Sequence, residues 1–130
     1  MGGDLMSDYP PVLAVDFDGT IVENKFPGIG KLMPNSKEVL QRLYGMGCRI
    51  IIWTCRTGMR LEDAIDFCNA EGIPFDTVNE NLPEIIQAFG GDMRKVFANY
   101  YIDDRNLWGL GSWLLIEKVI LSDPYFKEEE

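Results

Sequence analysis

Two pairs of aspartates end apolar runs in this chain. Asp16 and Asp18 come at the end of the run 12–15, and Asp103 and Asp104 directly follow a second run. If both runs are neighbouring parallel strands, these four carboxylates meet at one edge of a sheet. Two ionised carboxylates about 4 Å apart repel each other by about 4 kcal/mol at an effective dielectric constant of about 20. A divalent cation with oxygen ligands, most simply Mg²⁺, is therefore the predicted occupant.

Residue types outside these pairs narrow the chemistry. The chain has no histidine, which removes the commonest general base and every histidine-ligated metal site. Acid–base work must then fall to carboxylates, lysine, tyrosine or cysteine. The net charge of −9 at pH 7 disfavours binding to extended nucleic acid. No apolar stretch approaches the roughly 18 residues of a membrane span, so no membrane partner is expected.

The cysteines argue for a reducing compartment. Cys48, Cys55 and Cys68 form neither an even set nor a Cys-x-x-Cys pair, which argues against a disulfide scaffold or a zinc site. We therefore expect a cytoplasmic protein. Cys55 also opens a segment that resembles the Cys-x₅-Arg loop of cysteine phosphatases but is one residue too short. We interpret Cys55 as a packing or incidental residue.

Strand-like and helix-like patterns alternate along the chain. Continuous apolar or β-branched runs predict buried strands over 12–17, 48–54, 75–78 and 96–103. Apolar residues at helical spacing predict helices over 35–45 (or 35–47), 59–71, 82–89 and 112–122. Asn35 should cap the first helix together with Glu38, and Gly72 should end the second in a left-handed conformation.

This alternation predicts the fold. Strands alternating with helices indicate right-handed βαβ crossovers and a parallel sheet with helices on both faces, that is, an α/β, Rossmann-like three-layer sandwich. A strand order of 3-2-1-4 would place Asp16 beside Asp103 at the point where the strand order reverses, where such sheets bind ligands. The predicted domain covers 12–122, between an N-terminal extension (1–11) and an acidic tail (123–130).

Four segments near the predicted strand ends occur in a characteristic order: Asp16-Phe17-Asp18-Gly19-Thr20, Thr54, Lys95 and Asp103-Asp104. They resemble the four motifs of the haloacid-dehalogenase-like (HAD) phosphohydrolase superfamily, and the resemblance covers roughly residues 12–106. It implies that Asp16 attacks phosphorus and forms an aspartyl-phosphate. It also implies that Asp18 protonates the leaving oxygen and then activates the hydrolytic water.

The resemblance also implies a metal site. Mg²⁺ would bind Asp16, Asp103 and the backbone carbonyl of Asp18. Asp104 would orient a metal-bound water or Lys95. Lys95 would supply positive charge to the nucleophile and the transition state.

Further residues are assigned to the substrate. The Thr54 hydroxyl would hold phosphoryl oxygens, and Gly19 and Thr20 would border the substrate where the chain leaves the strand. Arg56, with Arg60, could meet a substrate phosphate or carboxylate, and a solvated role for both arginines is left open.

Several assignments have alternatives. An Asp-x-Asp-Gly segment is also typical of a turn, Thr54 could simply end a strand, and a lysine ahead of a strand is often solvated. Candidates to replace Lys95 are Lys25, Lys31 and Arg94. Core packing is expected for the apolar residues after the second acidic pair, Trp108, Leu110 and Trp113.

The predicted function is a Mg²⁺-dependent phosphatase that acts on a phosphomonoester, either a phosphorylated small molecule or a nucleotide. No independent cap domain fits between Thr20 and the second strand, so the site should be open, sheltered by the loop 21–34 or by a partner subunit. Homo-oligomerisation is left open. The alternatives are a non-catalytic binding or regulatory protein on a HAD scaffold and a phospho-accepting signalling domain. The signalling domain is disfavoured because in receiver domains the adjacent acidic pair comes early, whereas here it ends the fourth strand.

Overall fold

The sheet at the centre of the fold is parallel and has four strands. A computed structural model describes residues 9–126 of the chain. The strands are β1 (Val12–Val15), β2 (Arg49–Ile52), β3 (Thr77–Val78) and β4 (Tyr100–Ile102), in the order β3-β2-β1-β4. Leu13 of β1 lies opposite Ile50 of β2 and Tyr100 of β4. The predicted strand order and the α/β, Rossmann-like fold are confirmed.

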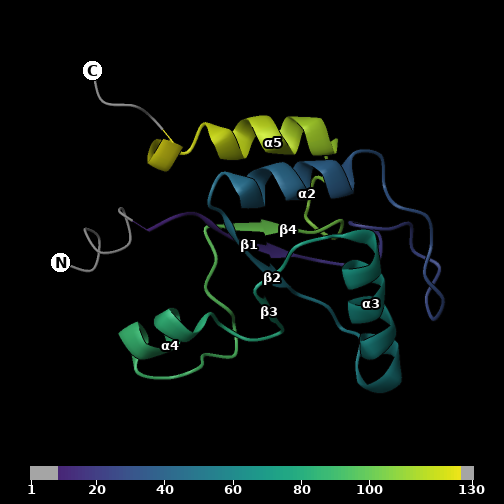
Figure 1. Ribbon diagram of the computed structural model, residues 1–130, viewed down its shortest axis with the longest axis horizontal. Helices are drawn as coiled ribbons and strands as arrows, with labels where there is room; N and C mark the ends of the chain where they lie inside the picture. Colours follow the sequence, from purple (N-terminus) through teal and green to yellow (C-terminus); the bar gives the residue numbers. More distant parts are fainter. Residues whose placement is uncertain (1–8, 127–130) are drawn as a thin grey trace.

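Helices cover both faces of the sheet (Figure 1). They are α2 (Ser36–Gly45), α3 (Gly58–Glu71), α4 (Pro83–Phe89) and α5 (Trp113–Leu121), followed by the 3₁₀ turn η1 (Pro124–Phe126). One buried cluster joins Leu13 and Val15 to residues of α2, α3 and α5. A second cluster, which we call the α4-side cluster, joins Val12 and Ala14 to Ile85 of α4. Successive strand residues point to opposite faces, so β1 must be apolar throughout to fill both clusters.

The fourth strand is shorter than the sequence predicts. Val96 and Ala98 fall outside β4 and are buried in the α4-side cluster. Asn99 then joins this segment to the sheet, because its N–H donates to the Val12 carbonyl and its Oδ1 accepts from Val12 N, both at 2.8 Å. The apolar pattern of 96–98 reflects burial, and burial alone does not specify a strand.

The predicted capping of α2 is wrong. Asn35 has left-handed backbone angles (φ 66°, ψ 5°), and its side chain makes no capping hydrogen bond within the described residues. The buried Ser36 hydroxyl instead donates to the Ile21 carbonyl at 2.9 Å and fixes the helix start against the preceding loop. The left-handed end of α3 at Gly72 (φ 75°) is confirmed, and Ser112 caps α5 through its side chain.

Both ends of the described chain pack on the domain. Tyr9, from the predicted extension, packs against the α4-side cluster, and its hydroxyl accepts from Arg49 Nη1 at 2.9 Å. Phe126, from the predicted tail, packs against the other cluster. The rest of these two segments, 1–8 and 127–130, lies outside the described residues. None of the helices in the described range is both long and apolar enough to cross a membrane.

Candidate active site

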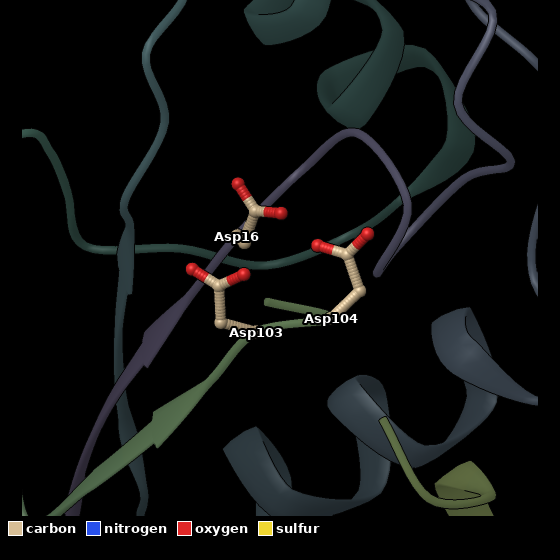
Figure 2. A group of neighbouring side chains, drawn as sticks. All are labelled: Asp16, Asp103 and Asp104. Atoms are coloured by element: carbon tan, nitrogen blue, oxygen red, sulfur yellow. The ribbon is translucent and has the colours of Figure 1, made fainter. Parts of the chain in front are cut away.

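The ends of β1 and β4 bring three aspartates together. Asp16 N donates to the Ile102 carbonyl at 2.9 Å, so the chain stays paired up to the residue before Asp103. One carboxylate oxygen from each of Asp16, Asp103 and Asp104 lies within 4.8 Å of the other two. Figure 2 shows these carboxylates around one space beyond the ends of the two strands.

Asp104 has an oxygen that lacks a partner. Its Oδ1 is buried and has no hydrogen-bond partner among the described residues. Burying a polar oxygen without a partner costs free energy of folding, and a bound cation would remove this cost. The donors are all carboxylate oxygens, which suit Mg²⁺. The cluster therefore fits the predicted cation. It contains three of the four carboxylates that were expected to meet, because the Asp18 side chain is not part of it.

The surroundings of Asp16 disfavour its ionised form. Its pKa is raised to about 7, first by burial and then by the negative charge of Asp103. Hydrogen bonds from the Phe17 backbone and the Thr20 hydroxyl act in the opposite direction. A proton and a cation therefore compete for Asp16 near neutral pH.

Thr20 links the two acidic segments. Its hydroxyl donates to Asp16 Oδ2 at 3.2 Å and accepts from Asp104 N at 3.0 Å. Its carbonyl accepts from the indole N–H of Trp113 at 2.9 Å. The sequence placed Thr20 among the substrate-binding residues, but a side chain with 0% exposure has no surface to offer a substrate. Thr20 instead fixes the position of Asp16 relative to Asp104.

Gly19 allows the second acidic segment to approach the first. It has a φ of +86°, and a Cβ at this position would lie 2.3 Å from Asp104 Oδ2. The backbone angle and the close approach both require glycine. Gly19 thus admits Asp104 to the cluster, in addition to turning the chain away from the strand as predicted.

Gly19→Ala is expected to weaken Mg²⁺ binding by about tenfold or more, because the methyl group displaces the Asp104 carboxylate. Gly90→Ala is a matched control, since Gly90 also has a positive φ (+80°) but a Cβ there meets nothing within 4 Å. The control should lose about 1 kcal/mol of stability and keep its Mg²⁺ affinity. Calorimetric titration with Mg²⁺ measures both affinities. Equal affinities in the two variants would contradict this role of Gly19.

A cavity of about 420 Å³ opens at this end of the sheet. Four segments line it, through Asp16, Asp18, Asn24, Phe26, Thr54, Cys55, Arg56, Asp103 and Arg105. Asn24, Phe26 and Arg105 were not predicted to lie at the site. Arg105 could have been found because it directly follows the second acidic pair. Asn24 and Phe26 lie in an irregular loop that carries no motif.

Arg56 forms part of the cavity wall, with its side chain only 1% exposed. Its Nε and Nη2 donate to the two oxygens of Asp18 at 2.7 and 2.8 Å. The other N–H groups donate to the backbone carbonyls of Pro27, Gly28 and Arg60. A guanidinium has five N–H donors, and these contacts use all of them. None is left for the substrate contact that the sequence predicted.

Of the two other predicted catalytic residues, Thr54 lies at the cavity and Lys95 does not. Thr54 lines the cavity, and its hydroxyl accepts from Arg56 N at 3.1 Å. Lys95 is exposed and lies outside the cavity wall, with its Nζ 5.2 Å from the centre of the Tyr101 ring. The structure therefore does not bring Lys95 to the acidic cluster. The cavity wall, as far as the described residues form it, also omits the three alternatives, Lys25, Lys31 and Arg94.

Residues assigned to packing divide into two groups. Trp113 is buried and Leu110 packs against the core, as expected. Trp108 is 94% exposed, so the core packing predicted for it is wrong.

Cys55 is exposed and borders the cavity. Burial raises the pKa of Cys48 to about 12 and that of Cys68 to about 12, so these two thiols stay protonated at neutral pH.

Comparison with solved structures identifies a relative. The chain is similar to a conserved protein from Bacteroides thetaiotaomicron, with 39% identity over 91% of this chain and 99% of that chain and a TM-score of 0.77. The chain belongs to the family of this Bacteroides protein. That relative is described only as conserved, so membership of its family assigns no activity.

A second solved structure is less similar to this chain. A Vibrio cholerae protein, provisionally described as a 3-deoxy-D-manno-octulosonate 8-phosphate phosphatase, shares 18% identity and a TM-score of 0.47, over 97% of this chain and 91% of that chain. This likeness is too low to carry an argument about activity. No family model and no curated protein matches the sequence.

Proposed function

We propose that the protein is a Mg²⁺-dependent phosphatase of the HAD type, which hydrolyses a phosphomonoester through an aspartyl-phosphate on Asp16. The observation that carries this proposal is the meeting of Asp16, Asp103 and Asp104, in which Asp104 Oδ1 is buried and has no hydrogen-bond partner among residues 9–126. Such a cluster, in a cavity at the carboxyl end of a parallel sheet, is suited to holding a cation and a phosphate group together.

The chemistry divides between two carboxylates. Asp16, Asp103, Asp104 and the Asp18 carbonyl would hold Mg²⁺, which when bound supplies positive charge for the phosphoryl oxygens. Asp16 attacks phosphorus, the bond to the leaving oxygen breaks, and Asp18 gives that oxygen a proton. Asp18 then takes a proton from water, whose oxygen attacks the phosphorus of the aspartyl-phosphate. The bond between phosphorus and the Asp16 oxygen breaks, which releases inorganic phosphate and regenerates Asp16. The Thr20 hydroxyl orients Asp16 throughout, because it donates to Oδ2.

A phosphoryl-transfer site also needs a side-chain cation. We assign this role to Arg105, because Lys95 lies outside the cavity and the donors of Arg56 are all in use. Arg105 is held beside the cluster through its backbone N–H, which donates to Asp103 Oδ1 at 2.9 Å.

Arg105→Gln is therefore expected to lower kcat/KM by about 10²-fold. Lys95→Gln is the matched control and should leave kcat/KM nearly unchanged, because Lys95 contacts neither the cluster nor the cavity. Steady-state kinetics with phenyl phosphate and Mg²⁺ provide the measurement. The reverse pattern, with Lys95→Gln inactive and Arg105→Gln active, would restore Lys95 to the role that the sequence predicted.

A substrate panel tests the proposed function. Purified protein with Mg²⁺ is assayed for phosphate release from phosphorylated small molecules and nucleotides, and we expect turnover that requires both Mg²⁺ and Asp16. A phospho-enzyme that forms but is not hydrolysed would indicate the phospho-accepting signalling domain instead. Ligand binding without any phospho-enzyme would indicate the non-catalytic regulatory protein. The cytoplasmic location and the oligomeric state stay predictions that this assay does not address.

A further inference from the structure

We propose that Arg56 is a positioning residue that ties the Asp18 carboxylate to the loop at 26–28 and thereby makes this loop a fixed wall of the substrate cavity. The proposal rests on the proposed function for its catalytic consequence. The structural tie itself can be tested without any activity.

The loop has little burial of its own. Residues 23–28 are all exposed, and Phe26 is 57% exposed although it lines the cavity. A segment of this kind does not hold one conformation through apolar packing. Its fixed contacts with the rest of the domain therefore decide where the cavity wall lies.

Arg56 supplies such contacts from a buried position. Its guanidinium donates to the Pro27 carbonyl at 3.3 Å and to the Gly28 carbonyl at 2.7 Å. The Phe26 ring centre lies 5.0 Å from Cζ, and the ring of Phe17 lies 5.3 Å from it. Attraction between a desolvated guanidinium and aromatic rings adds to the hydrogen bonds. Three consecutive loop residues are thus held by one side chain.

The same guanidinium fixes Asp18. Both Asp18 oxygens accept from Arg56, in the bidentate geometry that gives an arginine–carboxylate pair its orientation. The acidic cluster that could hold a metal ion consists of Asp16, Asp103 and Asp104 and does not include the Asp18 side chain. Arg56 therefore orients this carboxylate beside the cluster, and each Asp18 oxygen keeps a second lone pair that can take a proton.

This arrangement couples the loop to the chemistry. A displaced loop would pull on the two carbonyl contacts of Arg56, and a displaced Arg56 would release the Asp18 carboxylate. Phe26, held by the same side chain, gives the leaving group an apolar surface at the cavity wall. Lysine at position 56 would keep the charge beside Asp18 but lacks the planar fork that reaches Asp18 and the loop together.

Limited proteolysis tests the tie directly, because trypsin can cut after Lys25 within this loop. Arg56→Gln and Arg56→Lys are expected to speed cleavage after Lys25 by about tenfold or more. Arg60→Gln is the control, since the Arg60 side chain is 55% exposed and only its backbone carbonyl contacts Arg56. It should leave cleavage unchanged. If Arg56→Gln does not fold, Arg56→Lys decides, because it retains the charge paired with Asp18.

Kinetics separate positioning from stability. For a folded Arg56→Lys protein, kcat with phenyl phosphate should fall about 10²-fold through loss of Asp18 alignment, and KM should rise as Phe26 moves. Phe26→Ala should raise KM and leave kcat within about twofold. Unchanged cleavage after Lys25 in a folded Arg56 variant would overturn the proposal. A wild-type protein with slow cleavage but no phosphatase activity would instead defeat only the proposed function.

Discussion

Asp16→Asn is expected to lower turnover by at least about 10⁴-fold and, at the same time, to stabilise the metal-free protein above pH 7. The pKa of Asp16 is about 7 in the folded protein, against an ordinary value of 3.8. The folded state therefore binds this proton more tightly than the unfolded state does. The contribution of Asp16 to the stability of the folded state therefore falls as the pH rises from about 4 to about 7. Asparagine cannot ionise, so the substitution removes this loss.

Asp18→Asn is the matched control for that experiment. It should also lose activity, by about 10²- to 10⁴-fold, because acid–base help is gone. Its stability should move in the opposite direction, since the Arg56 side chain is 1% exposed and would lose its ionised partner. Breaking such a pair costs about 3 kcal/mol.

Thermal melts in EDTA at pH 5 and pH 8, with phosphate-release assays on the same samples, give both readouts. Asp16→Asn should melt above the wild type at both pH values, and by a larger margin at pH 8 than at pH 5. A wild-type rate in Asp16→Asn would end the covalent mechanism. A lower melting temperature in Asp16→Asn at pH 8 would show that burial and repulsion at Asp16 are not as the structure has them.

Mg²⁺ should stabilise the wild-type protein as well as activate it. At a hundred times its dissociation constant a ligand adds about 2.7 kcal/mol, which corresponds to roughly 10 °C for a chain of this length. The shift should be larger at pH 8 than at pH 5.5, because at the lower pH a proton occupies Asp16 and must be released. In Asp16→Asn this dependence on pH should disappear.

Variants of the other two aspartates and a second cation test whether the Mg²⁺ effect arises at the acidic cluster. Asp103→Asn and Asp104→Asn should each reduce the Mg²⁺-induced shift, because both contribute an oxygen to the cluster. Ca²⁺ should raise the melting temperature but support little turnover, since it tolerates a bidentate carboxylate and so misaligns Asp16. Full activity in EDTA, or no thermal response of the wild type to Mg²⁺, would contradict the site.

The acidic cluster could be predicted because it follows from topology. Asp16 and Asp103 each come directly after an apolar run, and neighbouring parallel strands end at the same edge of a sheet. No contact between distant side chains had to be known in advance. The strand order then followed from the need to place β4 beside β1.

Contacts made through irregular segments could not be predicted in this way. The pairing of Arg56 with Asp18 depends on the path of the loop at 26–28, and no periodic pattern encodes that path. Lys95 was assigned to the site through the resemblance and its position eight residues ahead of Asp103. Val96 and Ala98 are buried outside any strand, and Lys95 lies over the Tyr101 ring instead.

The close approach of Asp104 to Gly19 also restricts how this chain can evolve. A side chain at position 19 would collide with the Asp104 carboxylate, so neither residue can change freely while the other stays. A relative that gains any larger residue at position 19 must first shorten position 104, and it then gives up an oxygen of the cluster. We therefore expect the two positions to covary. Relatives in which both have diverged would be those that have lost the proposed cation site and, with it, the proposed hydrolysis.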